Sequence, residues 1–343
     1  MGINGQIGSY LYEILHNKNY RIYGIVRTIP QNKLPGVTYL KCDLSDQEGL
    51  KQIIISVHPD EIYNMAAQTD ALISISQPEE TMWVNTNIVV TLCEMARQYG
   101  FKLFQSGSIE IYKGLNLTTI DENTLSFYPK NPYAISKLAS HWMVRYYREQ
   151  HGCYMVNGII FNAESPRRKE TYVTRKITLF VRKIFNLTGD PQGLDKIENL
   201  TGSPQALDKI LNDPDYVLTL GNLDAERDWI HASDVAMAAW MSLQHNVPQD
   251  YIIGLGTNHS VRTFIEKSFA YVGITIIWKG KFINEIGIDD KTGRILVRID
   301  PSLFRQYETK TVPLHGDNTQ LKSIGWVPKY TLDDIIHELI DYQ

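Results

Sequence analysis

The sequence predicts an α/β protein with a doubly wound parallel sheet, and two observations support this. In the first half of the chain, short apolar and β-branched runs alternate with segments of helical apolar spacing, a pattern typical of a parallel sheet with helices on both faces. Three glycines spaced three residues apart, Gly2, Gly5 and Gly8, stand directly before the first helical segment. Glycines in this position are typical of Rossmann-type nucleotide-binding folds.

The elements follow from the periodicity of the apolar residues. Strands are expected at 20–26, 37–41, 61–66, 102–105 and 155–161, and helices at 10–17, 47–57, 86–99 and 133–150. After residue 161 the alternation ends, and proline, glycine and charged residues become frequent. We therefore expect 1–161 to form mainly the nucleotide-binding domain. Residues 162–343 are expected to form mainly a smaller substrate-binding lobe, with some segments returning to the sheet.

The composition is that of a soluble globular protein. The chain has 343 residues, of which 43% are hydrophobic and 21% charged, and its formal net charge is -4. This charge gives no bulk attraction to nucleic acid or to an anionic membrane. Three widely separated cysteines favour neither a disulfide framework nor a zinc site, and no metal-ligand cluster is expected. With no membrane-length apolar run and no signal peptide, the sequence predicts a cytoplasmic protein.

One segment contains a tandem duplication with a period of thirteen residues. Residues 186–197 read NLTGDPQGLDKI, and residues 199–210 read NLTGSPQALDKI. Two polar copies are too few for a solenoid. We expect 186–210 to be a duplicated surface insertion, and binding of a partner is the alternative.

The glycine turn predicts a dinucleotide site. Glycines let the backbone approach a pyrophosphate, and the following helix offers free N–H groups and a positive dipole. Arg27, at the end of the next strand, is placed for the 2′-phosphate of NADP, and Asp43 and Leu44 for the adenine. These residues favour NADP over NAD.

A central strand is expected to be missing from the sheet. In this fold the glycine turn follows a first strand in the middle of the sheet, yet here the turn begins at Gly2. A central parallel strand is buried on both faces, so its loss costs more than the net stability of a typical domain. We expect an added upstream segment of about six apolar residues to improve solubility. Equal solubility with and without it would refute this.

Tyr133 and Lys137 stand one helical turn apart on one face of the expected helix over 133–150. A nearby cation favours the phenolate, so Tyr133 can take a proton from a sugar hydroxyl. Lys137 can also hold the nicotinamide ribose. The pair occurs by chance in many helices, and the glycine turn upstream makes it a candidate catalytic pair.

Further polar residues follow the strand at 102–105. Ser108 can hydrogen-bond a substrate hydroxyl, and Glu110 can act as a base towards a carbon acid. The alternative is a polar loop with one solvated carboxylate. His231 can be catalytic, but a structural role is favoured.

The stretch 162–176 contains three arginines, two lysines and two glutamates, which fits neither an amphipathic helix nor a strand. A solvated loop is one interpretation, and a site for a nucleotide-linked sugar is the other. Arg227 and Arg305 suit phosphate groups, because the guanidinium fork binds them bidentately. Glu308 offers a carboxylate for ribose hydroxyls.

Taken together, these motifs resemble the GDP-mannose 4,6-dehydratases of the extended short-chain dehydrogenase/reductase superfamily. The resemblance covers nearly the whole chain. It includes residues 2–11, 59–68 and 127–137, and its most specific signature is 162–178. Residues 220–231, 285–293 and 316–328 complete it.

The resemblance implies an internal redox cycle on GDP-mannose. Tyr133 would deprotonate the C4 hydroxyl while hydride moves to NADP, Glu110 would remove the C5 proton, water would leave C6, and hydride would return to C6. The product would be GDP-4-dehydro-6-deoxy-mannose. The implied catalytic residues are Ser108, Glu110, Tyr133 and Lys137.

The binding residues implied by the motifs and the resemblance form two groups. The cofactor group is Gly2, Gly5, Gln6, Ile7, Gly8, Arg27, Asp43, Leu44, Ala66, Ala67, Gln68, Thr69, Tyr133, Lys137, Ala163 and Arg168. The substrate group is Asn162, Val173, Lys176, Arg227, Arg305 and Glu308.

The sequence also departs from this family's pattern. Ile109 replaces a hydroxyl residue beside Glu110, Asp70 replaces a histidine, and Glu80 stands in place of a cofactor-contacting tyrosine. A shortened loop after Arg27 predicts a dimer through the long helices and not a tetramer. Two alternative functions stay open: an NADP-dependent GDP-sugar reductase or epimerase, and a catalytically degenerate nucleotide-sugar-binding protein.

Overall fold

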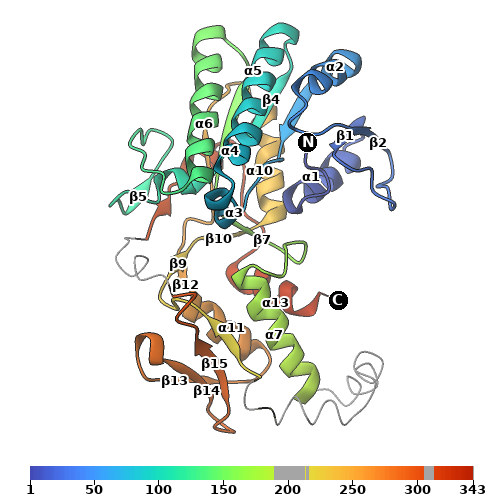
Figure 1. Ribbon diagram of the computed structural model, residues 1–343. Coiled ribbons are helices and arrows are strands. Elements are labelled where there is room, and N and C mark those ends of the chain that lie inside the picture. The colour runs from blue at the N-terminus through green and yellow to red at the C-terminus, as the bar shows by residue number, and fades with distance from the viewer. Residues whose placement is uncertain (189–212, 214–215, 305–312, 343) are drawn as a thin grey trace. The chain divides into compact units, whose positions relative to one another are not determined.

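The computed structural model describes residues 1–188, 213, 216–304 and 313–342, whose elements are shown in Figure 1. The chain divides into two compact units. The first unit comprises Met1–Ala163, Asp228–Thr257 and Leu314–Lys329. The second unit comprises Glu164–Arg227, Asn258–Pro313 and Tyr330–Gln343. The duplicated segment 186–210 lies almost wholly outside the described residues.

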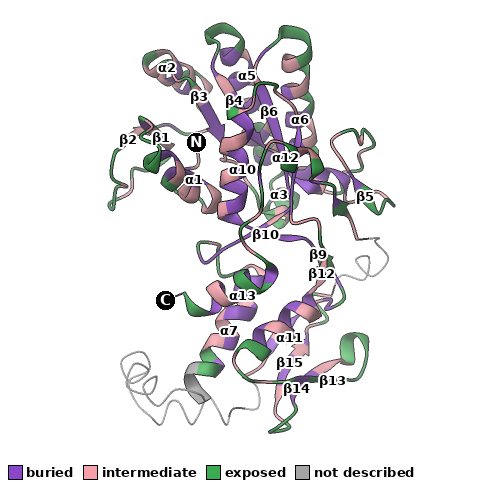
Figure 2. Cartoon of the chain, turned by 180° about the vertical axis from the view of Figure 1, so that it is seen from behind, coloured by how far each residue is buried: buried purple, intermediate pink, exposed green. Residues whose placement is uncertain are grey.

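The centre of the first unit is a four-stranded parallel sheet with the order β11-β6-β4-β3. Its strands are β3 (Glu61–Asn64), β4 (Lys102–Ser106), β6 (Met155–Ile160) and β11 (Tyr251–Ile253). Nearly all of their residues are buried, as the purple strands in Figure 2 show. Because helices cover both faces of such a sheet, residues on both sides of its strands are buried and burial does not alternate along them.

Strands β1 (Ile22–Val26) and β2 (Val37–Lys41) form a separate parallel pair. Within the described residues no strand joins β1 to β3, so the single sheet that the sequence predicts is interrupted at this point. The start of the chain lies beside β3, where the amino group of Met1 donates to Tyr63 O (2.8 Å) and Met65 N donates to Met1 O (3.3 Å).

Helices cover the sheet on two sides through separate apolar clusters. One cluster joins α1 (Gln6–Asn17) and α10 (Ala232–Gln244) to the sheet. The other joins α2 (Gln47–Val57), α5 (Ile88–Tyr99) and α6 (Pro132–His151). This arrangement confirms the predicted α/β class with helices on both faces.

The caps explain where two of these helices begin. Asp46 accepts a hydrogen bond from Gly49 N (2.8 Å) at the start of α2. Asn131 accepts one from Ala134 N (2.8 Å) at the start of α6, and Pro132 occupies the first helical position. Asp and Asn favour helix starts because their side chains accept from N–H groups that have no partner inside the helix. Proline favours the first helical position because it has no N–H group to satisfy.

The bounds of β2 and α2 agree with the prediction. The helix predicted over 86–99 differs, since its start is a π-helical turn, η1 (Trp83–Asn87), that leads into α5. Two short helices that were not predicted, α3 (Ala71–Ser76) and α4 (Pro78–Met82), precede this turn. Asp70 caps α3 by accepting from Leu72 N and Ile73 N, which gives this departure from the family pattern a structural role.

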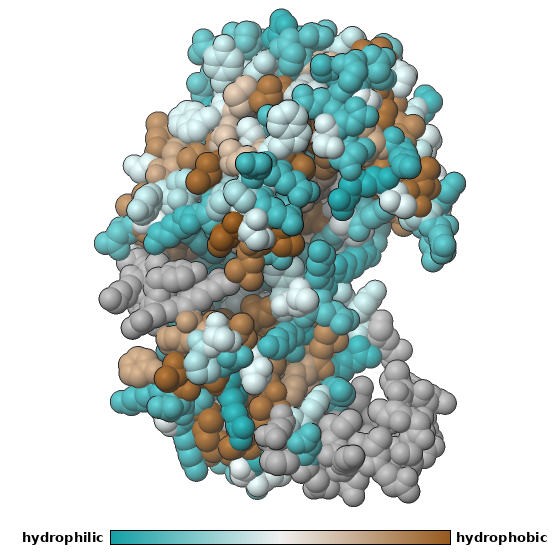
Figure 3. Space-filling model, in the orientation of Figure 1, coloured by the Kyte–Doolittle hydropathy of each residue, from teal (hydrophilic) through white to brown (hydrophobic). Residues whose placement is uncertain are grey.

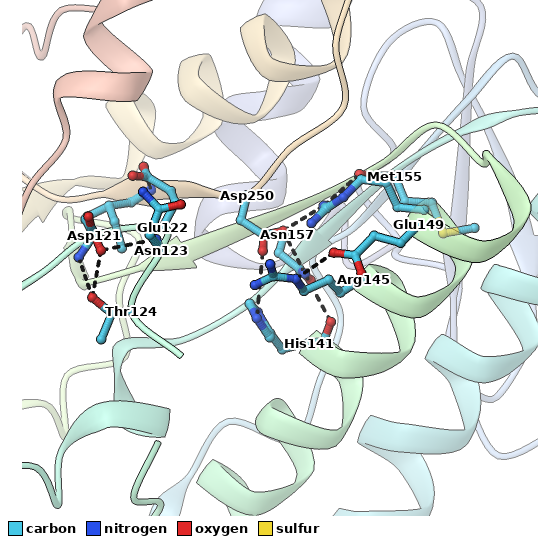
Figure 4. A network of polar contacts seen from close by, with 12 residues as sticks. Asp121, Glu122, Asn123, Thr124, His141, Arg145, Glu149, Met155, Asn157 and Asp250 are labelled. Carbon is cyan, nitrogen blue, oxygen red and sulfur yellow. Dashed lines mark hydrogen bonds and ion pairs between the residues drawn. The ribbon is translucent and has the colours of Figure 1, made fainter. Parts of the chain in front are cut away.

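A buried polar network ties α6 to strands β6 and β11 (Figure 4). Asp250, just before β11, accepts hydrogen bonds from Arg148 of α6 (2.7 Å) and Asn157 of β6 (3.0 Å). His141 Nε2 lies 3.8 Å from the same carboxylate. Burial raises the pKa of Asp250, but the hydrogen bond from Arg148 and the charge of His141 outweigh it, so the net shift is downward. The network therefore holds an ionised carboxylate against α6.

The described part of the second unit contains a four-stranded mixed sheet and three main helices. The sheet has the order β13-β14-β15-β8, with strands Ile276–Lys279, Ile286–Asp289, Ile295–Ile299 and Leu218–Leu220. The helices are α7 (Val173–Thr188), α11 (Val261–Tyr271) and α13 (Leu332–Asp341). Smaller elements of the chain are η2 (Ile109–Tyr112), β5 (Thr119–Ile120), β7 (Asn162–Glu164), β9 (Glu226–Arg227), β10 (Trp229–His231), β12 (His259–Ser260), η3 (Phe282–Asn284), β16 (His315–Gly316) and α12 (Thr319–Ser323).

Candidate active site

The four predicted catalytic residues belong to the first unit and come from α6 and the segment after β4. Lys137 Nζ donates a hydrogen bond to Ser106 O at the end of β4 (2.8 Å), which ties the helix to the strand. The same ammonium lies 5.8 Å from the centre of the Tyr133 ring. The predicted pair is therefore adjacent in space, at the carboxyl end of a central strand.

Burial sets the protonation of Lys137. Its exposed fraction is 3%, and burial lowers its pKa to about 8. A cation is disfavoured where water is excluded. Lys137 therefore titrates close to neutral pH, which suits a group that assists proton transfer.

Glu110 lies on η2, the single 3₁₀ turn that follows β4. Ser108 caps this turn, since its Oγ accepts a hydrogen bond from Glu110 N (3.3 Å). The Glu110 side chain is 21% exposed and forms an ion pair with Lys113. Ile109 is 5% exposed and belongs to an apolar cluster with Ile111. The residue that departs from the family pattern at this position is therefore part of the core.

The segment around Tyr128 holds this turn from the other side. Tyr128 N donates to Ile111 O (3.0 Å), and Gly114 N donates to Tyr128 O (2.9 Å). The rings of Tyr112 and Phe127 lie 5.0 Å apart. Two backbone hydrogen bonds and a ring contact thus fix the turn that carries Glu110.

The glycine turn lies against two other predicted cofactor segments. A Cβ on Gly8 would collide with Gly2 O, and one on Gly2 would lie 3.0 Å from Ala66 N. Gln6 Nε2 donates to Ala163 O (3.2 Å). No side chain caps the first turn of α1, so its N–H groups are available to an anion. The close backbone approach and the uncapped N–H groups make this turn suited to an anion such as a pyrophosphate.

Asn85 is a site residue that the sequence did not reveal. It lies on the π-helical turn, accepts from Gln68 N (2.8 Å), and donates to Gln68 O (2.9 Å) and to Ser136 Oγ (3.0 Å). It thus joins a predicted cofactor segment to the helix of Tyr133. π-helical turns are frequent at functional sites, but no local pattern in the sequence indicates this one.

A second polar connection runs under the strand ends. Asn64 Nδ2 donates to Gln105 Oε1 (2.8 Å), and Gln105 Nε2 donates to Ser106 O (2.9 Å), the atom that also accepts from Lys137. Both side chains are buried. The ends of β3 and β4 are therefore held in register below the candidate site.

The residues predicted for the adenosine end of the cofactor lie at the ends of β1 and β2. Arg27 and Asp43 are exposed, and Leu44 is partly buried. Hydrogen bonds from the Ser45 N–H and hydroxyl lower the pKa of Asp43, and the charge of Arg27 has a smaller effect in the same direction. Asp43 is accordingly a carboxylate at neutral pH.

The charged stretch 162–176 is ordered around the buried Glu164. Arg168 forms an ion pair with Glu164 (2.7 Å) and stacks on Tyr172 (3.9 Å to the ring centre), and Thr174 Oγ1 donates to Glu164. Burial raises the pKa of Glu164, partly offset by Arg168. Lys176 Nζ donates to Thr219 O (2.6 Å). The interpretation as a merely solvated loop is wrong, because the stretch is built on internal contacts.

The other predicted substrate residues are separated along the chain. Asn162 begins β7, Val173 begins α7 and Arg227 ends β9. Arg305 and Glu308 lie outside the described residues. His231 is fully buried and caps α10 by accepting from Ser233 N (3.1 Å), which is the structural role that was favoured.

Comparison with known proteins places the chain in a family. Residues 1–254 match the model of the NAD dependent epimerase/dehydratase family, and residues 184–339 match the model of GDP-mannose 4,6 dehydratase. A GDP-mannose 4,6-dehydratase of Vibrio cholerae is 36% identical over 99% of this chain and 91% of that protein. The human GDP-mannose 4,6 dehydratase is 37% identical over 99% of this chain and 89% of that protein.

Two solved structures share the fold. The UDP-glucose 4-epimerase of Thermotoga maritima, solved with UDP-glucose, has a TM-score of 0.73 at 17% identity and covers 99% of this chain and 96% of its own. RMD from Pseudomonas aeruginosa, complexed with NADPH, has a TM-score of 0.69 at 19% identity, with coverage of 99% and 96%.

The fold and the match over residues 1–254 define a member of the NAD dependent epimerase/dehydratase family, of the extended short-chain dehydrogenase/reductase type. Within this class, the sequence identity of 36% and 37% to two GDP-mannose 4,6-dehydratases over 99% of the chain points to one family. The protein belongs to the GDP-mannose 4,6-dehydratase family.

Proposed function

We propose that the protein is a lyase that converts GDP-mannose to GDP-4-dehydro-6-deoxy-mannose. The observation that supports this best is the juxtaposition of the buried Tyr133–Lys137 pair with the turn of Ser108 and Glu110, all within one compact unit. A reductase or an epimerase needs the pair but not the carboxylate. Membership of the dehydratase family favours the reaction that uses both.

In the first half of the reaction, Tyr133 accepts the proton of the C4 hydroxyl. The Lys137 ammonium stabilises the phenolate, because an opposite charge nearby favours the charged form. Lys137 is in turn oriented by its hydrogen bond to Ser106 O. Ser108, which is 7% exposed, offers a hydroxyl beside the reacting carbon.

In the second half, Glu110 accepts the C5 proton. A ketone at C4 acidifies this position, so a carboxylate is a sufficient base once the first half has occurred. Loss of the C6 hydroxyl as water completes the elimination. Glu110 passes the C5 proton to the departing C6 hydroxyl, which leaves as water and restores the carboxylate. As hydride returns to C6, Tyr133 gives the proton taken from the C4 hydroxyl to C5, which restores the phenolate for another cycle.

The cofactor that fits the glycine turn is a nicotinamide dinucleotide, and we propose NADP. When bound, NADP supplies hydride acceptance from C4 and hydride return to C6. The residues proposed to hold it are Gly2, Gly5, Gln6, Ile7, Gly8, Arg27, Asp43, Leu44, Ala66, Ala67, Gln68, Thr69, Tyr133, Lys137, Ala163 and Arg168. Arg27 supports NADP over NAD, since its exposed guanidinium follows β1 and can pair with a 2′-phosphate.

The proposed grip on the GDP moiety comes from mostly polar and charged residues spread along the second half of the chain. Its members are Asn162, Val173, Lys176, Arg227, Arg305 and Glu308. Guanidinium and ammonium groups suit the diphosphate, and carboxylate oxygens suit ribose hydroxyls.

We also propose that the protein forms a dimer through α6. Three large side chains on this helix, Ile135, Trp142 and Tyr146, are 46%, 44% and 49% exposed. Their spacing of seven and four residues puts them on one face of the helix. Apolar residues interrupt the hydrophilic surface of this unit in Figure 3. Trp142→Glu should shift the mass measured by analytical ultracentrifugation towards the monomer, and Phe282→Glu, at an exposed position of the second unit, should not.

A cytoplasmic location is proposed from the cysteines. Cys42, Cys93 and Cys153 are all free and buried, as befits a reducing compartment. In the described part of the chain no helix is both long and apolar enough to cross a membrane.

The test is to incubate the purified protein with GDP-mannose, with and without added NADP, and to measure product mass. Loss of one water with no net change in NADPH is the expected result. Turnover that needs stoichiometric NADPH would indicate a reductase instead. Binding of GDP-mannose without turnover would indicate a nucleotide-sugar-binding protein.

A further inference from the structure

The ion pair between Glu110 and Lys113 follows from the geometry of η2. A 3₁₀-helix has three residues per turn, so side chains at positions i and i+3 lie directly above one another. Lys113 Nζ contacts Glu110 Oε1. Among the described residues, no hydrogen bond or ion pair engages Oε2. The pair therefore fixes one carboxylate oxygen and leaves the other available.

This pair differs from an ordinary surface ion pair of the same spacing. Glu48 and Lys51 on α2 are 3.4 Å apart, and their side chains are 69% and 41% exposed. The corresponding values for Glu110 and Lys113 are 21% and 31%. Water screens the Glu110–Lys113 pair less, because both of its side chains are less exposed.

The surroundings leave Lys113 as the polar neighbour of Glu110 on this turn. Ile109 and Ile111, on either side of Glu110, are buried in an apolar cluster. The turn itself is held by hydrogen bonds between Ile111, Gly114 and Tyr128, not by the ion pair. Removing the charge of Lys113 should therefore change the position of the Glu110 carboxylate and leave the fold of the turn unchanged.

We infer that Lys113 is the positioning residue of the elimination step. Resting on the function proposed above, the inference is that the Lys113 ammonium holds Oε1 of Glu110 in place, so that Oε2 meets the C5 proton. Lys113 contacts the base from three positions further along the chain. Ile109, directly before the base, has no polar group that could contact it.

The test compares Lys113→Met, Lys113→Arg and the matched control Lys51→Met in the full-length protein with GDP-mannose and NADP. Lys113→Met should lower kcat for water loss by about 10- to 100-fold, since a small misplacement of a catalytic group has effects of this size. KM should stay the same, and the near-ultraviolet absorbance of reduced nicotinamide should accumulate during turnover, because only the second half is slowed. Lys113→Arg should recover most of the rate, and Lys51→Met should match the wild type.

The contrary results are distinct. Equal kcat for Lys113→Met and Lys51→Met would overturn the inference, as would a raised KM with unchanged kcat, which indicates a substrate contact. Slow turnover without accumulated reduced nicotinamide and with a lower melting temperature would indicate a structural role and also overturn it. A wild-type protein that releases no water would instead refute the proposed function itself, and the inference with it.

Discussion

The helix of Tyr133 and the turn of Glu110 hold their functional groups in different ways. Tyr133 and Lys137 are 9% and 3% exposed, and they lie in a helix of 20 residues that is anchored by buried polar contacts. Glu110 lies on a turn of four residues and is partly open to solvent. The Tyr133–Lys137 pair is thus held by burial in regular structure, whereas the Glu110 carboxylate is held by an ion pair with Lys113.

The largest effect is expected for Tyr133→Phe, which tests the helix side of the comparison. Without the phenol neither half of the reaction can begin, so kcat should fall by about 10³-fold or more. Tyr146→Phe, on the exposed face of the same helix, should have no such effect. Assays of water loss and of reduced nicotinamide should both be negative for Tyr133→Phe, and retention of either signal would show that another group accepts the C4 proton.

The next largest effect is expected for Glu110→Gln, which tests the turn. Water loss should fall by about 10²-fold, the usual contribution of a general base. Formation of reduced nicotinamide should persist, because the first half does not use this carboxylate. Glu48→Gln is the matched control on α2. Should Glu110→Gln release water at the wild-type rate, its role as the base would be excluded.

A pH experiment examines the buried amine. The pKa of Lys137 is lowered from 10.5 to about 8 in the folded state, so between these values the unfolded chain binds more protons than the folded one. The free energy of unfolding therefore rises with pH between pH 8 and pH 10.5. Below pH 8 it is reduced by the full cost of burying the charged Lys137. Relative to Lys137→Met, the free energy of unfolding of the wild type should rise by about 3 kcal/mol from pH 8 to 10.5. Denaturant midpoints at several pH values give the measurement, and parallel curves for the two proteins would contradict it.

A smaller effect is expected for Asn85→Ala. The change leaves Gln68 N and O without their partner, which should destabilise the protein by about 1–3 kcal/mol. Because Asn85 joins a cofactor segment to α6, kcat should fall as well, by about tenfold. Asn284→Ala, at an exposed position of the second unit, is the control. A variant that lost stability but kept full kcat would show that Asn85 is only structural.

Local patterns in the sequence were sufficient for much of the fold and for bringing the candidate residues Tyr133 and Lys137 together. The bounds of β2 and α2, and the adjacency of Tyr133, Lys137 and the end of β4, follow from periodicity and from the direction of parallel strands. Such features depend on residues that are close in sequence or on rules that hold for all parallel sheets.

The remainder depends on contacts between distant residues. Asn85 bonds to a residue 51 positions away, and nothing near it in the sequence marks that partner. The sequence shows Ile109 only as a residue without the hydroxyl that the family has at this position. It does not show that the side chain is buried, because it does not indicate which way a side chain in a single turn points. Asp70 was likewise read as a lost histidine, although it caps a short helix that has no clear periodic signal.

The Asp250 network also constrains the order in which the protein can mature. Arg148 reaches its carboxylate partner 102 residues further along the chain, and Asn157 reaches the same group over 93 residues. During synthesis, the helix of Tyr133 and Lys137 leaves the ribosome long before Asp250 is available. Arg148 of the nascent helix α6 thus gains the buried Asp250 carboxylate only when the first unit closes on itself late in translation.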